Sequence, residues 1–188
     1  MKNKMFRPSV KDILLEIDQV LSKADEKDIA LMIKEILKAK TIVAVGAGRV
    51  GMAVRAFAMR LGHLGLKAYT VGDSTVHSIG KGDLLLVCSG SGETQTIFDL
   101  VTIAKKNGSK IMLVTGNKNS RIGKLADTIV EVQAPSKTKK IDGFVSIQPM
   151  TTLNEQCLGI FFDTVVLLLM EKMHETHDTM WARHSNLE

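Results

Sequence analysis

Two short glycine-rich turns, each placed between an apolar strand and a helix, constrain this chain most. The first, Gly46-Ala47-Gly48-Arg49-Val50-Gly51, follows an apolar strand, and so does the second, Ser89-Gly90-Ser91-Gly92-Glu93-Thr94. A strand–turn–helix with little side-chain bulk exposes backbone N–H groups at a helix N-terminus, where an anion, above all a phosphate, is stabilised. Two such turns in one open sheet predict one phosphorylated ligand at the carboxyl ends of the strands.

The order of the elements predicts an α/β fold with a doubly wound, five-stranded parallel sheet. Short, continuously apolar strands alternate with helices, as is typical of parallel strands covered on both faces. The 188 residues suit a single domain. Within it we expect N-terminal helices over 1–40, the sheet core over 41–147, and a C-terminal helix and tail over 148–188. Strands are expected at 41–46, 67–72, 84–89, 111–115 and 128–133, and helices at 9–22, 26–39, 50–63, 93–107, 120–126, 148–174 and 177–183.

The first two predicted helices are amphipathic. Ile13 and Ile17 fall on the apolar face of the first, and Ile29 and Ile33 on that of the second. The two helices are expected to form an antiparallel hairpin outside the sheet. Their apolar stripes need a partner, and a second subunit is a natural one.

Composition excludes several classes of protein. The net charge of +5 is spread out, and with one Trp and one Tyr the chain lacks base-stacking platforms, so we expect no nucleic-acid partner. The longest apolar run, 161–170, is too short to span a membrane, and the first residues lack an apolar signal core. Cys88 and Cys157 read as buried reduced thiols without metal-ligand spacing. A cytoplasmic protein without a metal is therefore expected.

The first turn fits two kinds of site. It matches G-x-G-x-x-G after a strand, and Asp73 near the end of the next strand is placed as in a nicotinamide-dependent enzyme. Against this, Arg49 lies inside the turn, a second phosphate-type turn follows, and the chain leaves little room for a separate substrate domain. Both interpretations stay open on this motif alone.

The second turn is more specific. Ser89, Ser91 and Thr94 supply three hydroxyls where a phosphate accepts both O–H and N–H bonds, and Glu93 is expected in the first turn of the following helix. Simple N-capping would explain Ser89 or Thr94 taken alone. It does not explain three hydroxyls together with two glycines.

Five segments together resemble the 6-phospho-3-hexuloisomerase family, which belongs to the sugar isomerase (SIS) domain group. They are the turn at 46–49, Phe57-Ala58-Met59-Arg60-Leu61, the turn at 89–94, Ile147-Gln148-Pro149-Met150 and the closing Arg183-His184-Ser185-Asn186-Leu187-Glu188. The resemblance implies a flavodoxin-like five-stranded sheet and a homotetramer. It also implies cofactor-free interconversion of D-arabino-hex-3-ulose 6-phosphate and D-fructose 6-phosphate, in the ribulose monophosphate pathway of formaldehyde fixation. Val50 departs from the family turn, where Ser is expected.

Moving a carbonyl from C3 to C2 requires a base that takes the C2 proton and returns it at C3 through a cis-enediolate. Glu155, near the start of the long C-terminal helix among apolar neighbours, is the first candidate for this base. The alternative for Glu155 is a glutamate that only complements the helix dipole. His63 and His184 compete for the proton transfers on the oxygens. For His63 the alternative is a core or interface histidine. His184 lies in a tail with no evident local anchor, so we expect it to dock into a neighbouring subunit.

Arg49 is the best cation beside the substrate, with an interface ion pair as its alternative. The expected substrate contacts are Gly48, Arg49, Ser89, Ser91, Gly92, Glu93 and Thr94. The lysine-containing segment 137–143 is either a solvated connector or a lid over an anion. Two other functions remain: a sugar-phosphate-binding SIS module without catalysis, and a nicotinamide oxidoreductase.

Overall fold

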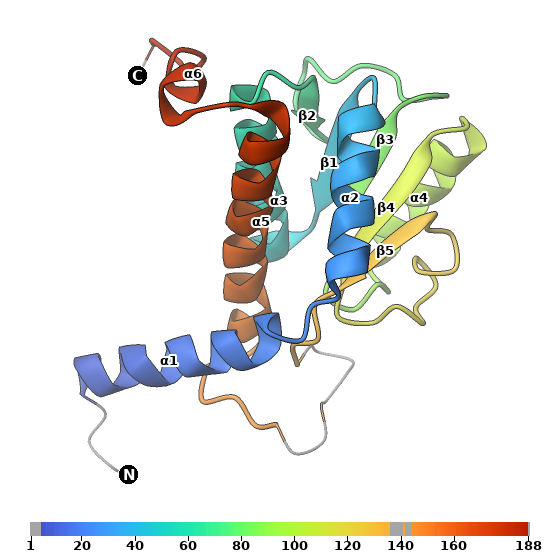
Figure 1. The fold of residues 1–188 in the computed structure, drawn as a ribbon. Coiled ribbons are helices and arrows are strands. Elements are labelled where there is room, and N and C mark those ends of the chain that lie inside the picture. Colours follow the sequence, from blue (N-terminus) through green and yellow to red (C-terminus); the bar gives the residue numbers. More distant parts are fainter. Residues whose placement is uncertain (1–4, 136–140, 142–143, 188) are drawn as a thin grey trace.

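The computed structural model describes residues 5–135, 141 and 144–187. One sheet of five strands has the order β2-β1-β3-β4-β5, and each pairing in it is parallel (Figure 1). This confirms the predicted fold class. The order reverses between β1 and β3, and in open α/β sheets a ligand binds at such a switch point, beyond the carboxyl ends of the strands. The strands are β1 Ile42–Gly46, β2 Ala68–Thr70, β3 Leu84–Cys88, β4 Lys110–Thr115 and β5 Thr128–Glu131.

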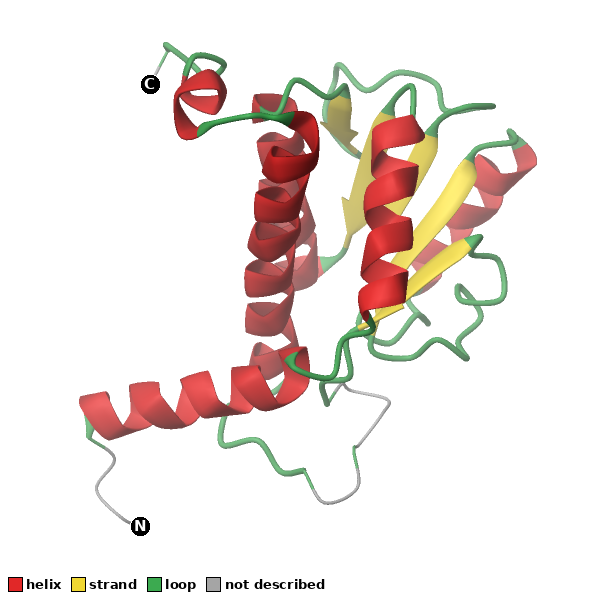
Figure 2. Cartoon of the chain, in the orientation of Figure 1, coloured by secondary structure: helices red, strands yellow, loops and turns green. Residues whose placement is uncertain are grey.

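Helices cover both faces of the sheet (Figure 2). Leu86 and Cys88 of β3 pack into a core with α2, α3 and α5, whereas Leu85 and Val87 pack with α4 on the other face. This alternation follows from the two-residue period of a strand, and it explains why the strands read as continuously apolar. The helices are α1 Phe6–Leu21, α2 Glu26–Lys38, α3 Gly48–His63, α4 Gln95–Lys106, α5 Thr152–Met173 and α6 His177–Trp181.

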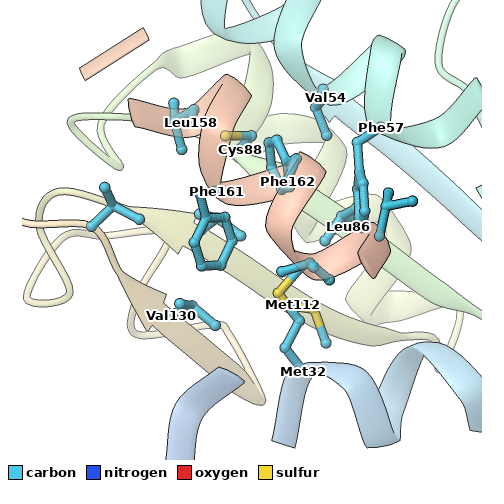
Figure 3. Close-up of a cluster of buried hydrophobic side chains, with 14 of the residues drawn as sticks. Met32, Val54, Phe57, Leu86, Cys88, Met112, Val130, Leu158, Phe161 and Phe162 are labelled. Carbon is cyan, nitrogen blue, oxygen red and sulfur yellow. The ribbon is translucent and has the colours of Figure 1, made fainter. Parts of the chain in front are cut away.

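Helices α3 and α5 lie side by side, and this pair carries the candidate residues Arg49, His63 and Glu155. Phe57 of α3 stacks on Phe162 of α5 with 4.6 Å between ring centroids, inside the larger core (Figure 3). Among the described residues, α5 alone is long and apolar enough to cross a membrane. However, Leu158, Phe161 and Phe162 bury one of its sides against the sheet and neighbouring helices. A buried core helix passes that same test, so α5 is weak evidence for a membrane.

The two N-terminal helices are present, but the predicted antiparallel hairpin is wrong. Helix α2 lies on the sheet beside β5 and α5, and α1 runs across the direction of α2 to pack on α5 (Figure 1). The buried residues of α2 explain this arrangement, because Met32 and Ile36 belong to the core under the sheet. The α2 stripe is therefore covered within the chain, while Phe6 and Leu14 of α1 stay exposed.

The predicted helix at 120–126 is also wrong, because this segment is a series of tight turns. The N–H of Ile122 donates to the carbonyl of Gly92 at 3.2 Å rather than to a carbonyl one helical turn back. At Gly123 a Cβ would lie 2.1 Å from the carbonyl oxygen of Lys118, so only glycine lets the backbone approach itself this closely here. The segment is built to contact the second glycine turn.

Helix α5 begins later than predicted, at Thr152 instead of residue 148. Pro149 accepts a bond from the N–H of Thr152 at 3.1 Å, and Met150 has φ +55°, a left-handed conformation that ends any helical path. Residues 147–151 therefore form an irregular entry to the helix. The predicted connector or lid at 137–143 lies outside the described residues, apart from Ile141.

Candidate functional site

The two glycine turns meet at the carboxyl edge of the sheet. Gly46 at the end of β1 pairs with Cys88 at the end of β3, and a Cβ on Gly46 would lie 3.0 Å from the Cys88 carbonyl oxygen. On the other side, the N–H of Gly116 after β4 donates to the carbonyl of Gly90 at 3.0 Å. The two turns are thus neighbours at the switch point of the sheet, as the sequence predicts.

The second turn is held in shape by its own hydroxyls. The N–H of Gly92 donates to Ser89 Oγ at 3.1 Å, and the N–H of Glu93 donates to Ser91 Oγ at 3.2 Å. Gly92 has φ +66°, and a Cβ there would lie 2.0 Å from Ser120 Oγ, so only glycine fits. Thr94 is the N-cap residue of α4, with no side-chain cap bond. The turn presents small hydroxyl side chains and backbone N–H groups at a helix N-terminus, which is the chemistry of a phosphate site.

Glu93 does not lie in the first turn of the helix, because α4 begins at Gln95. Its carboxylate instead accepts the N–H of Arg121 at 3.0 Å and lies 3.5 Å from the Arg121 guanidinium. The Arg121 side chain in turn donates to Gln95 Oε1 at 2.7 Å. The Glu93 side chain therefore ties the turn to segment 120–125, and its backbone N–H, the remaining candidate for substrate, donates to Ser91 Oγ.

Glu155 lies in the first turn of α5, beside the first glycine turn. Thr151 Oγ1 donates to Glu155 Oε1 at 2.8 Å, and Arg49 Nε lies 3.2 Å from Glu155 Oε2. The Glu155 side chain is 14% exposed and that of Arg49 is 57% exposed. The neighbours of the carboxylate are thus polar, not largely apolar as expected. Gly48, with φ +59°, makes the turn that starts α3 and so brings Arg49 to this position.

The two candidate histidines lie together at the opposite end of the α3–α5 pair. The rings of His63 and His184 are 5.2 Å apart between centroids, in a cavity that Arg60 and Asp163 also line. Arg49 and His63 stand at opposite ends of α3, which at the usual helical rise separates them by about 20 Å. The structure brings the histidines to each other but not to Glu155 of the same chain.

The C-terminal tail has a local anchor, so the expectation that it lacks one is wrong. Arg183 donates to the carbonyl of His63 at 3.0 Å, and its guanidinium forms a two-pronged pair with Glu175 at 2.8 and 2.9 Å. This pairing holds the pKa of Glu175 below its ordinary value, with a further hydrogen bond from Thr179 acting in the same direction. The anchor sets His184 against His63.

Sequence reasoning missed three further groups at these ends. Trp181 stacks on His184 with 5.0 Å between ring centroids. Asn154 is 2% exposed and lies against Gly90 of the second turn, and its Nδ2 has no hydrogen-bond partner among the described residues. Glu16 of α1 accepts three hydrogen bonds from residues 146–148. Contacts between distant segments identify Asn154 and Glu16, and no local motif marks any of the three residues.

The structure speaks against a dinucleotide at the first turn. Asp73, the acidic residue that such a site would use, accepts bonds from the N–H of Thr70 at 3.3 Å and from Thr70 Oγ1 at 2.6 Å. The hydroxyl bond lowers the pKa of Asp73 most. The carboxylate is thus already engaged in closing the turn after β2.

The described residues contain no group of three or more His, Cys, Asp or Glu side chains that could hold a metal ion. Both cysteines are free and buried, as predicted. Burial raises the pKa of the Cys88 thiol far above its ordinary value and that of Cys157 to about 12, where the nearby charge of Glu16 adds to the effect. Both thiols are therefore protonated near neutral pH and unsuited to nucleophilic work.

Comparison with known families gives a match to the SIS domain over residues 35–158. The match covers the sheet, both glycine turns and the first turns of α5. The fold and the edge with its two turns are therefore those of a SIS domain.

Relatives of known name resolve this further. The chain is 36% identical to 3-hexulose-6-phosphate isomerase of Bacillus subtilis, and the match covers 95% of this chain and 97% of that protein. It is also 36% identical to the protein of the same name from Mycobacterium gastri, where the match covers 92% of this chain and 86% of that protein. A solved structure from Methanococcus jannaschii, described as inferring a 3-hexulose-6-phosphate isomerase function, matches with a TM-score of 0.82 at 30% identity, covering 96% of this chain and 99% of that one. The chain belongs to the SIS domain family and, within it, to the 3-hexulose-6-phosphate isomerases.

Proposed function

We propose that this protein is a sugar-phosphate isomerase that interconverts D-arabino-hex-3-ulose 6-phosphate and D-fructose 6-phosphate. The observation that carries the proposal is the contact of Glu155 with Arg49 at the sheet edge, next to the hydroxyl-lined turn at 89–94. The named relatives support the same reaction. A cytoplasmic role in formaldehyde fixation through the ribulose monophosphate pathway follows as part of this proposal.

In the proposed reaction Glu155 is the carbon base. Its carboxylate takes the proton from C2, the electron pair of the broken C–H bond forms a cis-enediolate across C2 and C3, and the same carboxyl returns the proton to C3. The hydroxyl proton of O2 passes to O3, with His63 or His184 as its proposed carrier. One carbon is oxidised and its neighbour reduced, so the reaction needs no external oxidant or reductant. The guanidinium of Arg49, 3.2 Å from the carboxylate, is placed to stabilise negative charge that develops on the oxygens.

The phosphate of the substrate is assigned to the second turn. The hydroxyls of Ser89, Ser91 and Thr94 would bind it, together with the N–H groups of Gly92 and Glu93. Those two N–H groups donate to Ser89 Oγ and Ser91 Oγ, which gathers donors and hydroxyls in one place. Binding of a phosphate would exchange these bonds for bonds to the phosphate oxygens. Gly48 has no side chain, so it leaves space for the substrate at the first turn, beside this phosphate position.

The proposed active form is a homotetramer with sites shared between subunits. His63 and His184 are about 20 Å from Arg49 of their own chain by helical rise, so they can act on a substrate at Glu155 only if that Glu155 belongs to another copy. Helices α3 and α5 suit such a contact, because both expose large apolar side chains. These are Met52, Met59, Ile160 and Leu167.

A direct assay tests the proposal. The purified protein is incubated with D-arabino-hex-3-ulose 6-phosphate, and D-fructose 6-phosphate is measured with a coupled enzyme, while a thermal-shift series compares sugar phosphates with NAD and NADP. Turnover of the hexulose phosphate supports the isomerase. Stabilisation by sugar phosphates without turnover would instead indicate a non-catalytic SIS module, and stabilisation by a nicotinamide nucleotide alone would indicate an oxidoreductase.

A further inference from the structure

The segment Ile147-Gln148-Pro149-Met150 enters the helix that carries Glu155, yet none of its side chains has a part in the proposed chemistry. It is irregular: Met150 has φ +55° and is 88% exposed, so neither a regular backbone nor burial holds it in place. A non-glycine residue in this conformation is strained and persists only where its surroundings fix it. Something outside the segment must therefore define its path.

The structure supplies that restraint from α1. Glu16 Oε1 accepts the backbone N–H of Ile147 at 2.7 Å, and Glu16 Oε2 accepts both Ser146 Oγ at 2.8 Å and Gln148 Nε2 at 3.0 Å. Ser146 Oγ also accepts the N–H of Gln148 at 3.0 Å, so backbone and side chains are bound in one network. Hydrogen bonds to a charged carboxylate are stronger than neutral ones, and here three converge on one group.

Two observations place Glu16 against the catalytic helix itself. Helix α1 packs on α5, with Ile17 and Val20 buried in the shared core. The charge of Glu16 also contributes to the raised pKa of the Cys157 thiol, one half-turn beyond Glu155. The carboxylate is thus held between the entry segment and α5.

The restraint reaches Glu155 through a short path. From Gln148 the chain passes Pro149, whose carbonyl accepts the N–H of Thr152 at 3.1 Å and so opens the helix. Thr151 Oγ1 then donates to Glu155 Oε1 at 2.8 Å. A displacement of the entry segment therefore moves the hydroxyl that orients the carboxylate.

We propose that Glu16 is a positioning residue for the isomerase reaction, which acts through residues 146–151 on the orientation of Glu155. This inference rests on the proposed function. Helix α1 lies far from both glycine turns in the sequence. The inference gives it a role in catalysis in addition to its packing on α5.

The test is the variant Glu16→Gln, which keeps one acceptor oxygen but presents an NH2 group to donors. We expect kcat for hexulose 6-phosphate to fall about tenfold or more, because small displacements of a catalytic group are costly, while KM changes less than about twofold. Glu16→Asp keeps both acceptor oxygens and should recover part of kcat. Asp12→Asn, an exposed carboxylate one turn earlier on α1, is the matched control and should behave like the wild type.

A double variant separates positioning from general stability. If Glu16 acts through Glu155, adding Glu16→Gln to Glu155→Gln should lower kcat no further. Hydrogen exchange should show faster exchange in 146–155 of Glu16→Gln, with the strands unchanged. Two results would overturn this inference and leave the proposed function standing. The first is an active wild type whose kcat is unaffected by Glu16→Gln, and the second is a double variant in which the two effects on kcat multiply. A wild type without isomerase activity overturns the proposed function and this inference with it.

Discussion

The two ends of the α3–α5 pair are built in different ways. At the sheet edge, strand pairing brings Gly46 and Cys88 together, so the main chain itself aligns the two turns and the starts of α3 and α4 that follow them. At the opposite end no strand takes part. There the rings of His63, Trp181 and His184 gather by side-chain contact, and Arg183 holds the tail in place.

This difference indicates which groups of the candidate site a single chain brings together. At the sheet edge Arg49 contacts the carboxylate of Glu155, and the same edge carries the hydroxyl-rich turn proposed to bind the phosphate. The histidine end has the proposed proton-transfer groups, but the described residues there form no glycine-rich turn like the two at the sheet edge. Each end holds what the other lacks, which is the reason to expect that they meet between subunits.

The largest expected effect comes from removing the base at the sheet edge. Glu155→Gln keeps size and hydrogen-bonding shape but cannot take the proton, so kcat should fall at least about 10²-fold with KM mostly retained. Steady-state kinetics with hexulose 6-phosphate measure this. Glu171→Gln, an exposed glutamate on the same helix, is the control. A near-normal kcat in Glu155→Gln would move the base to the other end, first to His63.

The second effect concerns the phosphate at the same edge. Ser91→Ala removes one charge-assisted hydrogen bond and should raise KM by an amount equivalent to roughly 1–3 kcal/mol. The triple variant of Ser89, Ser91 and Thr94 to alanine should raise it more, and Thr102→Ala, on the exposed side of α4, should leave it unchanged. An unaltered KM in the triple variant contradicts the assignment of the phosphate to this turn.

Mixing experiments test whether the two ends complete one site. Chains with Glu155→Gln are combined with chains with His184→Ala, dissociated and reassembled. If each site takes Glu155 from one copy and His184 from another, about a quarter of the sites in a random mixture are intact, and activity recovers to that fraction of the wild type. Verified hybrids that stay inactive would mean that each site is built from a single chain.

The sequence predicted the sheet edge much better than the histidine end. Apolar strands and glycine turns are local patterns, so both turns, their neighbouring positions and Glu155 near a helix start could be read directly. The ring contact between His63 and His184 joins residues 121 positions apart, and the hydrogen bond from Arg183 to the His63 carbonyl joins residues 120 positions apart. No local pattern encodes such contacts. The failed helix at 120–126 has the same cause, because a bond from Ile122 to Gly92 overrides its helical propensity.

Glycine substitutions at the two ends should have opposite signs. Gly92→Ala at the sheet edge forces a Cβ into a left-handed conformation and against Ser120 Oγ, which should cost about 2–4 kcal/mol in the free energy of unfolding. Gly62→Ala near the histidine end lies within α3 with nothing in the way of a Cβ, and should stabilise by about 0.5–1 kcal/mol. Denaturant unfolding measures both. A neutral Gly92→Ala would show that the turn is not fixed as described.

The smallest effect is the acid sensitivity of the histidine end. Glu175 has a lowered pKa in the folded protein, so its pairing with Arg183 contributes fully above the ordinary carboxylate value of 4.5 and is lost as the pH falls through the lowered value. Because the Arg183 side chain of the pair is exposed to solvent, screening keeps its contribution small. Trp181, the only tryptophan, reports the docking of the tail by its fluorescence. The wild type should show a transition below about pH 4.5 that Glu175→Gln lacks, while far-UV circular dichroism stays unchanged in both. The same transition in Glu175→Gln would mean that the rings hold the tail without the Arg183 anchor.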